Sequence, residues 1–319
     1  MAKHSTSRRA LIVLLALLPV VAGCHHGYES PSPVGTAALV GPAVPRTPPT
    51  GLDAYKRPLI PLSVGLTWNY TITTSARLVT PRGPLPLEVF ASPWVVQIQG
   101  TQQIGNQLYF SQFAFNPLNR AAIIAVPSLV RQDGSGFYEL DVVRPAVTAE
   151  GAGSGSEPPT VPVPPSITDP GERAAFERAA REIAARLQGM RFAGFGWGGG
   201  GPSPLEISLL RYPLRVGAGW AVRERPLFTR TVTALERLTT PAGSFTAWRM
   251  RLGGEHFGPR DGAVAWYSAS GLVRLSSHFE GEAVDDTGNL VGRVIMETDQ
   301  VLDSITFTPF ANAVATQGR

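Results

Sequence analysis

The chain has 319 residues, of which 43% are hydrophobic and 16% are charged, so it is long and apolar enough to form a sizeable folded core. Its formal net charge is +4, but Lys3, Arg8 and Arg9 lie in an N-terminal segment without acidic residues, and removing those three charges leaves +1. A charge so close to zero excludes an electrostatic argument for binding nucleic acid.

Residues 1–23 have the pattern of a cleaved secretory signal peptide. The basic start is followed by Ala10–Ala22, which is apolar apart from Pro19. That run is too short to cross a membrane, which takes roughly 20 apolar residues. It therefore predicts export of the chain.

The end of this run, Val21-Ala22-Gly23-Cys24, resembles the lipobox of bacterial lipoproteins. In that family the cysteine thiol receives a diacylglycerol group and the peptide is cut just before it. Cys24 is the only cysteine, which also excludes an intramolecular disulfide framework. The resemblance implies a membrane anchor through a lipid on Cys24. His25 follows, where an aspartate would favour the inner membrane, so we expect the outer membrane facing the periplasm in a Gram-negative cell.

Proline and small residues dominate residues 24–58, and no apolar period is sustained there. Such a segment cannot bury a core, so we predict a disordered tether behind the lipidated cysteine. A β domain is expected over 59–309, followed by a frayed C-terminus over 310–319.

Short β-rich segments closed by turn residues fill most of this domain, which predicts a mainly β fold built on a curved antiparallel sheet or half-barrel. Trp68, Tyr70 and Ile72 alternate with polar residues, and Asp133-Gly134-Ser135-Gly136 has the composition of a hairpin turn. Further segments of this kind are expected at 94–99, 108–115, 121–126, 227–238, 245–252, 264–267, 272–284 and 290–307.

The β pattern stops over 145–204, which we predict to be a flexible and helical insertion. Asp169 can cap a helix that has Pro170 at its first position, and the pattern favours one amphipathic helix over about 170–189. Its apolar stripe is Phe176, Ala180, Ile183 and Leu187. Because this face is rich in alanine, we expect it to pack on the sheet rather than on a membrane.

One pattern, P-L-x-V-G-x-x-W, occurs twice, at Pro61–Trp68 and again at Pro213–Trp220. The physical interpretation is a turn that starts a strand. In it Gly65 and Gly217 take a backbone geometry that other residues resist, while Trp68 and Trp220 fill the core. The alternative is that the two tryptophans are accessible platforms for a ligand.

The repeats belong to a series of motifs that resembles a large group of bacterial envelope proteins. The series runs over roughly 60–300 in this order: P-L-x-x-G-x-x-W-x-Y at Pro61–Tyr70, P-L-x-x-G-x-x-W at Pro213–Trp220, P-A-G-x-F-x-A-x-R at Pro241–Arg249 and W-Y-x-x-x-G-L-V at Trp266–Val273. The resemblance implies a curved antiparallel sheet similar to the half-barrels of lipoprotein carriers such as LolA and LolB. It implies no reaction.

The sequence has no G-x-S-x-G, H-E-x-x-H or C-x-x-C motif, and no phosphate-binding loop. His278, Glu280 and Glu282 alternate along one expected strand and therefore share a face. They could bind a divalent metal or act as acid and base, although the outward face of any exposed strand is also polar. We predict the solvated face, and hence no metal and no cofactor.

Three functions remain open. The first is a non-catalytic envelope lipoprotein that binds a partner or an apolar ligand on its curved sheet. The second is a periplasmic metal-dependent or hydrolytic enzyme that uses His278, Glu280 and Glu282. The third is a structural or assembly protein with no ligand. We predict the first, and the sequence determines neither the ligand nor the oligomeric state.

Replacing Cys24 with serine removes the thiol that would carry the lipid. We therefore expect a clickable fatty-acid analogue to label the wild-type protein in cells and to leave Cys24→Ser unlabelled. Equal labelling of the two proteins would rule out lipidation at this residue.

Overall fold

The computed structural model describes residues 60–118, 128–140, 163–191, 206–224, 227–255 and 257–308. Cys24, the tether, the C-terminal segment over 310–319 and the expected strand at 121–126 lie outside these ranges, as do parts of the expected insertion.

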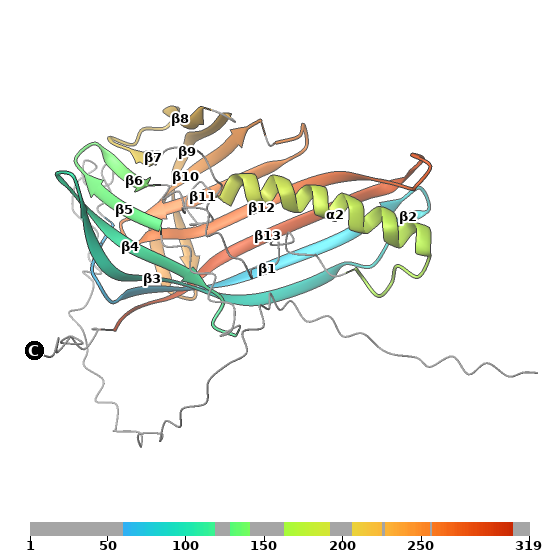
Figure 1. The fold of residues 1–319 in the computed structure, drawn as a ribbon, viewed down its shortest axis with the longest axis horizontal. Helices are drawn as coiled ribbons and strands as arrows, with labels where there is room; N and C mark the ends of the chain where they lie inside the picture. Colours follow the sequence, from blue (N-terminus) through green and yellow to red (C-terminus); the bar gives the residue numbers. More distant parts are fainter. Residues whose placement is uncertain are drawn as a thin grey trace, which may run out of the picture.

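The described chain forms one antiparallel sheet and one helix, α2 (Figure 1). Its elements are β1 Leu66–Thr80, β2 Gly83–Pro84, β3 Glu88–Ile104, β4 Gln107–Phe115, β5 Ser128–Asp133, β6 Gly136–Leu140, α2 Pro170–Arg191, β7 Glu206–Arg211, β8 Gly219–Glu224, β9 Leu227–Thr240, β10 Gly243–Gly254, β11 Gly262–Ser268, β12 Gly271–Val284 and β13 Leu290–Phe307. The expected mainly β class and the single helix are confirmed.

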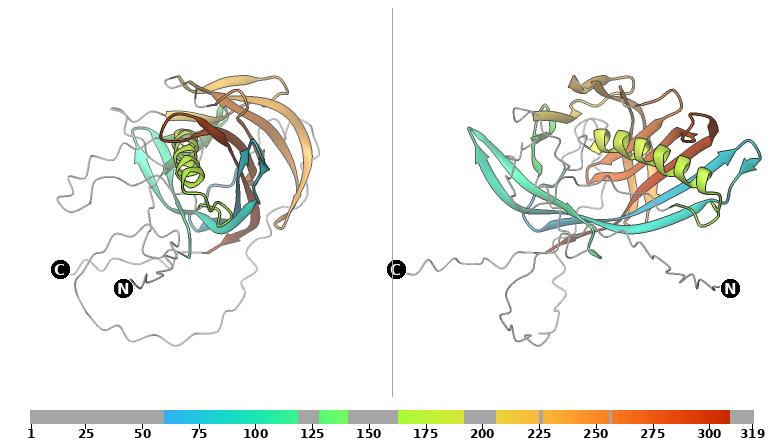
Figure 2. Two further views of the ribbon diagram at one scale, coloured as in Figure 1. Left: turned by 90° about the vertical axis from the view of Figure 1, so that its right-hand side faces the viewer. Right: turned by 45° about the vertical axis from the view of Figure 1, so that its right-hand side comes forward.

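The strands run across the sheet in the order β7-β6-β5-β4-β3-β1-β13-β12-β11-β10-β9-β8, with β2 paired to β1 off this path. Each half is a meander of neighbours in sequence, and the halves meet where β1 pairs with β13. The sheet curls until its two end strands, β7 and β8, approach each other (Figures 1 and 2). The sheet is therefore curved, as the sequence predicted, and it forms a nearly closed barrel.

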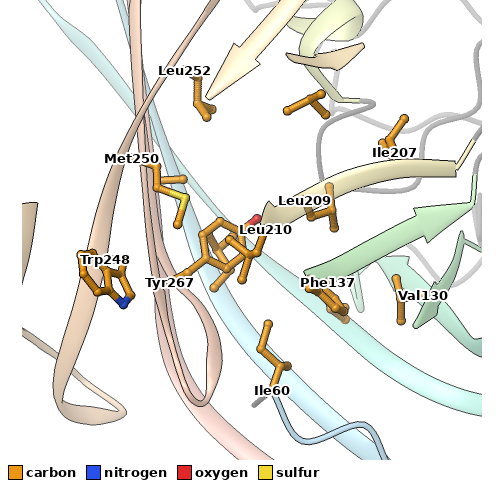
Figure 3. Packing of buried hydrophobic residues seen from close by; sticks show 14 of the residues in the cluster. Ile60, Val130, Phe137, Ile207, Leu209, Leu210, Trp248, Met250, Leu252 and Tyr267 are labelled. Carbon is orange, nitrogen blue, oxygen red and sulfur yellow. The ribbon is translucent and has the colours of Figure 1, made fainter. Parts of the chain in front are cut away.

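Alternation along the strands decides which side chains face the barrel interior. On β1, Leu66, Trp68 and Tyr70 are buried at one end and Ala76 and Leu78 at the other, all on the same face. The main apolar cluster gathers side chains from both halves of the sheet. Figure 3 shows residues of β10 and β11 meeting residues of β5, β6 and β7 across the interior.

Helix α2 lies inside the curve of the sheet (Figure 2, left). Its start is capped as expected, because the Asp169 carboxylate accepts a hydrogen bond of 2.9 Å from the Glu172 N–H. Phe176, Ala180 and Ile183 are buried, and they pack on a second apolar cluster that includes Phe279. Packing of the helix on the sheet, predicted from its alanine-rich face, is confirmed.

Two arginines of α2 also bind the edge of β12. They do so beyond His278, where β12 has no pairing partner in β11. Arg186 donates to the carbonyl of Glu280, and Arg178 donates to the carbonyls of Val284 and Asp285 at 3.0 Å. Arg178 and Arg186 are eight positions apart on the helix, and Glu280 and Val284 are four positions apart on the strand. Both separations correspond to about 12–13 Å, so the two arginines have the same spacing as the carbonyls they bind. The helix therefore satisfies backbone groups that a neighbouring strand would otherwise bind.

The two copies of the repeat adopt related local structures. Gly65 has φ +96° and its N–H donates to the carbonyl of Ile98 on the neighbouring strand β3. Gly217 has φ +85° and its N–H donates to the carbonyl of Val232 on the neighbouring strand β9. These left-handed geometries explain why glycine stands at both positions.

Both repeat tryptophans are buried, with exposed fractions of 4% for Trp68 and 7% for Trp220. Trp68 Nε1 donates to the carbonyl of Ser270 at 2.7 Å, and Tyr70 donates to the carbonyl of Leu272 at 3.0 Å. Side chains of the first motif therefore bind the backbone of the fourth motif, which lies on the far side of β13. The burial agrees with the structural interpretation of the repeat and opposes an accessible ligand platform.

The second repeat tryptophan bridges the seam between the two end strands of the sheet. Trp220 Nε1 donates to the carbonyl of Ser208 at 2.9 Å, and Arg230 Nη1 donates to the carbonyl of Leu209 at 2.7 Å. Both carbonyls belong to β7, and no backbone ladder joins β7 to β8 within the described residues. Side chains thus bridge the seam where strand pairing is missing.

The two repeat glycines make a matched pair for mutation. A Cβ on Gly65 would lie 2.2 Å from the carbonyl oxygen of Thr308, whereas a Cβ on Gly217 would meet nothing within 4 Å. Both alanine variants carry the strain of a positive φ, about 1–2 kcal/mol, and Gly65→Ala adds an overpacking cost of about 1–3 kcal/mol. We expect urea unfolding to show a larger loss of free energy for Gly65→Ala. Equal losses would mean that the backbone at Thr308, just after β13, moves away from residue 65 without cost.

Candidate functional site

The three residues considered as metal ligands lie on the outer face of β12. His278 lies between two carboxylates, with Nδ1 3.1 Å from Glu297 Oε1 and Nε2 3.2 Å from Glu280 Oε1. Arg260 and Arg293 each contact the other oxygen of Glu280, at 3.3 Å and 3.2 Å. Glu280 is therefore already neutralised by cationic partners.

Glu282, the third candidate, is exposed and lies opposite Arg293 on β13. Within the described part of the chain, no group of three or more His, Cys, Asp or Glu residues is arranged to hold a metal ion. The structure brings His278 and Glu280 together, but as part of an ion-pair network on the outside of the barrel.

The electrostatics of this network favour a protonated histidine. Burial lowers the pKa of His278, but hydrogen bonds with Glu297 and Glu280 outweigh burial and leave the pKa above its ordinary value. Burial raises the pKa of Glu280, and its bonds with His278 and Arg260 more than reverse that, so its pKa lies below the ordinary value. Both partners are thus favoured in their charged forms.

A second ionic network lies on the outer face and joins β4, β5, β6 and β7. Arg131 forms a two-pronged ion pair with Glu206, at 2.5 and 2.7 Å, and its guanidinium lies over the ring of Tyr138 at 4.2 Å. Tyr109 donates to the same Glu206 carboxylate at 2.9 Å. The network ties together the strands on either side of the helical segment, which is a structural role.

The inner face of the sheet has a different character from these outer networks. The strand register sorts its side chains into tiers across β3, β1, β13 and β12. One tier consists of Ser92, Ile72, Gln300 and Leu275, and the next consists of Phe90, Thr74, Thr298 and Ser277. These tiers lie between the main apolar cluster and the cluster under α2.

Five of these eight side chains are neutral and able to form hydrogen bonds. We call them the polar patch: Thr74, Ser92, Ser277, Thr298 and Gln300. Gln300 is only 5% exposed, and its Nε2 has no hydrogen-bond partner in the described part of the chain. The patch is flanked by half-buried apolar side chains, among them Ile72, Phe90 and Leu275.

Sequence reasoning did not identify this patch. On β13 the outward residues Glu297 and Asp299 are polar as well as the inward residues Thr298 and Gln300. Alternation of polar and apolar residues is therefore lost at this point, and with it the signal that distinguishes the two faces. Only the register with β1 shows that the threonine and the glutamine face inward.

Comparison with solved structures gives distant similarities. No protein-family model matches the chain, and no curated protein matches it. A candidate lipoprotein from Parabacteroides distasonis ATCC 8503 has a TM-score of 0.30 and 12% identity, covering 79% of this chain and 98% of that one. A candidate exported protein with a YmcC-like fold from Bacteroides fragilis NCTC 9343 has a TM-score of 0.30 and 10% identity, covering 78% and 98%.

Lipovitellin, solved in a study of lipid–protein interactions, has a TM-score of 0.26 and 10% identity, covering 79% of this chain and 26% of that one. TM-scores this low assign neither a fold nor a function to the present chain.

No helix within the described ranges is both long enough and apolar enough to cross a membrane.

The histidine network predicts a pH dependence of stability. Since the folded-state pKa of His278 is raised, its stabilisation is complete below the unfolded pKa of about 6.5 and is lost as the pH rises through the folded value. We expect His278→Gln to lower the melting temperature at about pH 6 and to match the wild type at about pH 9.

Glu297→Gln is the control for this effect, because it removes one of the two carboxylates and keeps the histidine. It should reduce the difference between the two pH values without abolishing it. A His278→Gln variant that parallels the wild type at every pH would show that the network does not hold the histidine in its charged form.

Proposed function

We propose that this protein is a membrane-anchored lipoprotein of the bacterial cell envelope that binds an apolar ligand or partner on the inner face of its curved sheet, without catalysing a reaction. The observation that carries the proposal is the row of aromatic side chains on that inner face. Phe90, Trp94 and Phe110 come from β3 and β4, face inward in the register, and are only half-buried.

These aromatic rings offer apolar surface that the barrel itself does not fully cover. Burying such surface stabilises a complex by roughly 25 cal/mol for each Å² removed from water. Binding sites for small apolar molecules are concave and lined by aromatic and aliphatic side chains. The inside of a curled sheet provides that shape.

The anchor is supported by the sequence around Cys24, whose lipobox resemblance implies a lipid at the start of the mature chain. The described chain begins at Ile60, near the end of the barrel where Leu66 pairs with Phe307. Lipidation at Cys24, and its position at the outer membrane facing the periplasm, remain predictions of the sequence.

The network around His278 gives little support to an enzyme. A general base needs a free site for a proton, but Glu280 is already bound by two arginines and the histidine. The similarity to carriers such as LolA and LolB, implied by the sequence motifs, agrees instead with binding. A structural role without a ligand is the remaining alternative and is an outcome of the test below.

Binding on the inner face can be tested with the uncharged fluorophore Nile red and the mature chain carrying Cys24→Ser. We expect fluorescence enhancement on binding, and an affinity about tenfold weaker in Trp94→Leu, because an inner aromatic surface is lost.

Trp266→Leu is the matched control. Trp266 is also half-buried, but it lies on the outer face of β11, where its Nε1 donates to Glu236 at 2.6 Å. That variant should bind Nile red like the wild type, and both variants should be checked for folding by thermal unfolding. A wild-type chain that does not bind the dye would favour the structural role. Loss of a cellular phenotype in a folded His278→Gln variant with intact dye binding would favour the enzyme.

A further inference from the structure

The polar patch is an unusual feature of the barrel interior. Apolar side chains fill the interior on either side of it, yet five neutral hydrogen-bonding residues face inward together on adjacent strands. Burying an amide or hydroxyl without a partner typically costs about 1–3 kcal/mol, so folded proteins seldom tolerate it without a role. Gln300 Nε2 is a buried donor of this kind.

Resting on the function proposed above, we propose that the polar patch receives the uncharged, hydroxyl-bearing head group of a single-chain lipid. The aliphatic chain of that lipid lies along the half-buried inner side chains Ile72, Phe90 and Leu275. Gln300 Nε2 donates a hydrogen bond to an oxygen of the head group, and the hydroxyls of Thr74 and Thr298 both donate and accept. The site is thus amphiphilic, as the ligand must be.

The charges near the patch argue for a head group without a negative charge. Glu88 faces inward on β3, opposite Ala76 and one tier beyond Phe90, and its carboxylate would repel an anion. The cation Arg230 belongs to the tier of Ser277, but it lies on β9, three strands away from β12. It is 1% exposed and donates to the carbonyl of Leu209. Arg186 of α2 lies over the ring of Phe279, one tier beyond Ser277, but it already pairs with Asp261. None of the five residues of the patch is a cation that could compensate a carboxylate or phosphate.

The dimensions of the patch also suit a small head group. Two tiers are separated by about 7 Å along a strand, and four neighbouring strands span about 14 Å. Ser92 is held in place by Asn116, whose Nδ2 donates to its Oγ at 2.8 Å. This area of sheet is comparable in extent with a glycerol unit and its ester.

The test compares two lipids that share the oleoyl chain and differ in the head: monooleoylglycerol, which has free hydroxyls, and methyl oleate, which has none. Each is titrated against Nile red bound to the mature chain carrying Cys24→Ser. We expect monooleoylglycerol to bind about tenfold more tightly, the effect of one or two neutral hydrogen bonds.

Gln300→Leu should reduce the affinity for monooleoylglycerol about fivefold and leave that for methyl oleate unchanged. Its melting temperature should not fall, because leucine replaces an amide nitrogen that lacks a protein partner. Gln102→Leu, the same change at an exposed position of β3, should have no effect on either lipid.

The outcomes separate this inference from the function on which it rests. If Nile red binds but both lipids displace it equally well, or if Gln300→Leu binds monooleoylglycerol like the wild type, the head-group site is wrong. The patch then holds ordered water only, while the apolar site stands. If neither the dye nor either lipid binds, both proposals fail.

Discussion

β1 and β13 pair along almost their whole length, from Leu66 opposite Phe307 to Val79 opposite Arg293, although nearly the entire described chain lies between them. This ladder joins the two meandering halves of the sheet, and every tier of the interior is defined by it. Because its contacts are so distant in sequence, pairing the two strands carries a large loop-closure entropy that the rest of the barrel must offset. Hydrogen bonds from Trp68 to the carbonyl of Ser270 and from Tyr70 to the carbonyl of Leu272 hold the start of β12 against the same junction from the inside.

The opposite junction, between β7 and β8, is held by side-chain hydrogen bonds and not by a backbone ladder. Each half of the sheet begins with the same P-L-x-V-G-x-x-W pattern, in β1 and in β8, so the two junctions hold equivalent positions in the two halves. One has a full backbone ladder, whereas the other is bridged by Trp220 and Arg230. A barrel of this kind has one strong seam and one weak seam. Local opening is cheapest where backbone pairing is absent.

The outer and inner faces of the barrel carry different kinds of side chain. The titratable network of His278, Glu280 and Glu297 lies outside, where water moderates the cost of charge, and it links β12 to β13. The inner face carries neutral polar groups and half-buried aromatic rings, and among its charged residues are Glu88 on β3 and Arg230 on β9. Helix α2 serves both requirements, since its apolar face covers Phe279 while Arg178 and Arg186 bind the free edge of β12. A ligand-binding interpretation depends on the inner face and a catalytic one on the outer network.

Local patterns in the sequence predicted much of the fold. Alternation predicted β1 and its neighbours, Asp169 and Pro170 predicted the start of α2, and the alanine-rich stripe predicted that the helix packs on the sheet. A positive φ at the glycine and a buried ring at the tryptophan of each repeat could be predicted because both are preferences of the residues themselves, and the structure has both. The lipidation of Cys24 is likewise a proposal that the sequence makes without help from the fold.

Tertiary structure alone decided the register, and the register decided the candidate site. Nothing in the sequence places Gln300 opposite Ile72 and Leu275, or Thr298 between Thr74 and Ser277, because these neighbours come from strands distant in the chain. A shift of one residue in the β1–β13 ladder would turn the polar patch outward, where such residues would be unremarkable. The sequence by itself determined which segments are strands and which face of the helix is buried, because those depend on residues a few positions apart. The contents of the barrel interior depended on pairing between strands, which the local pattern does not encode.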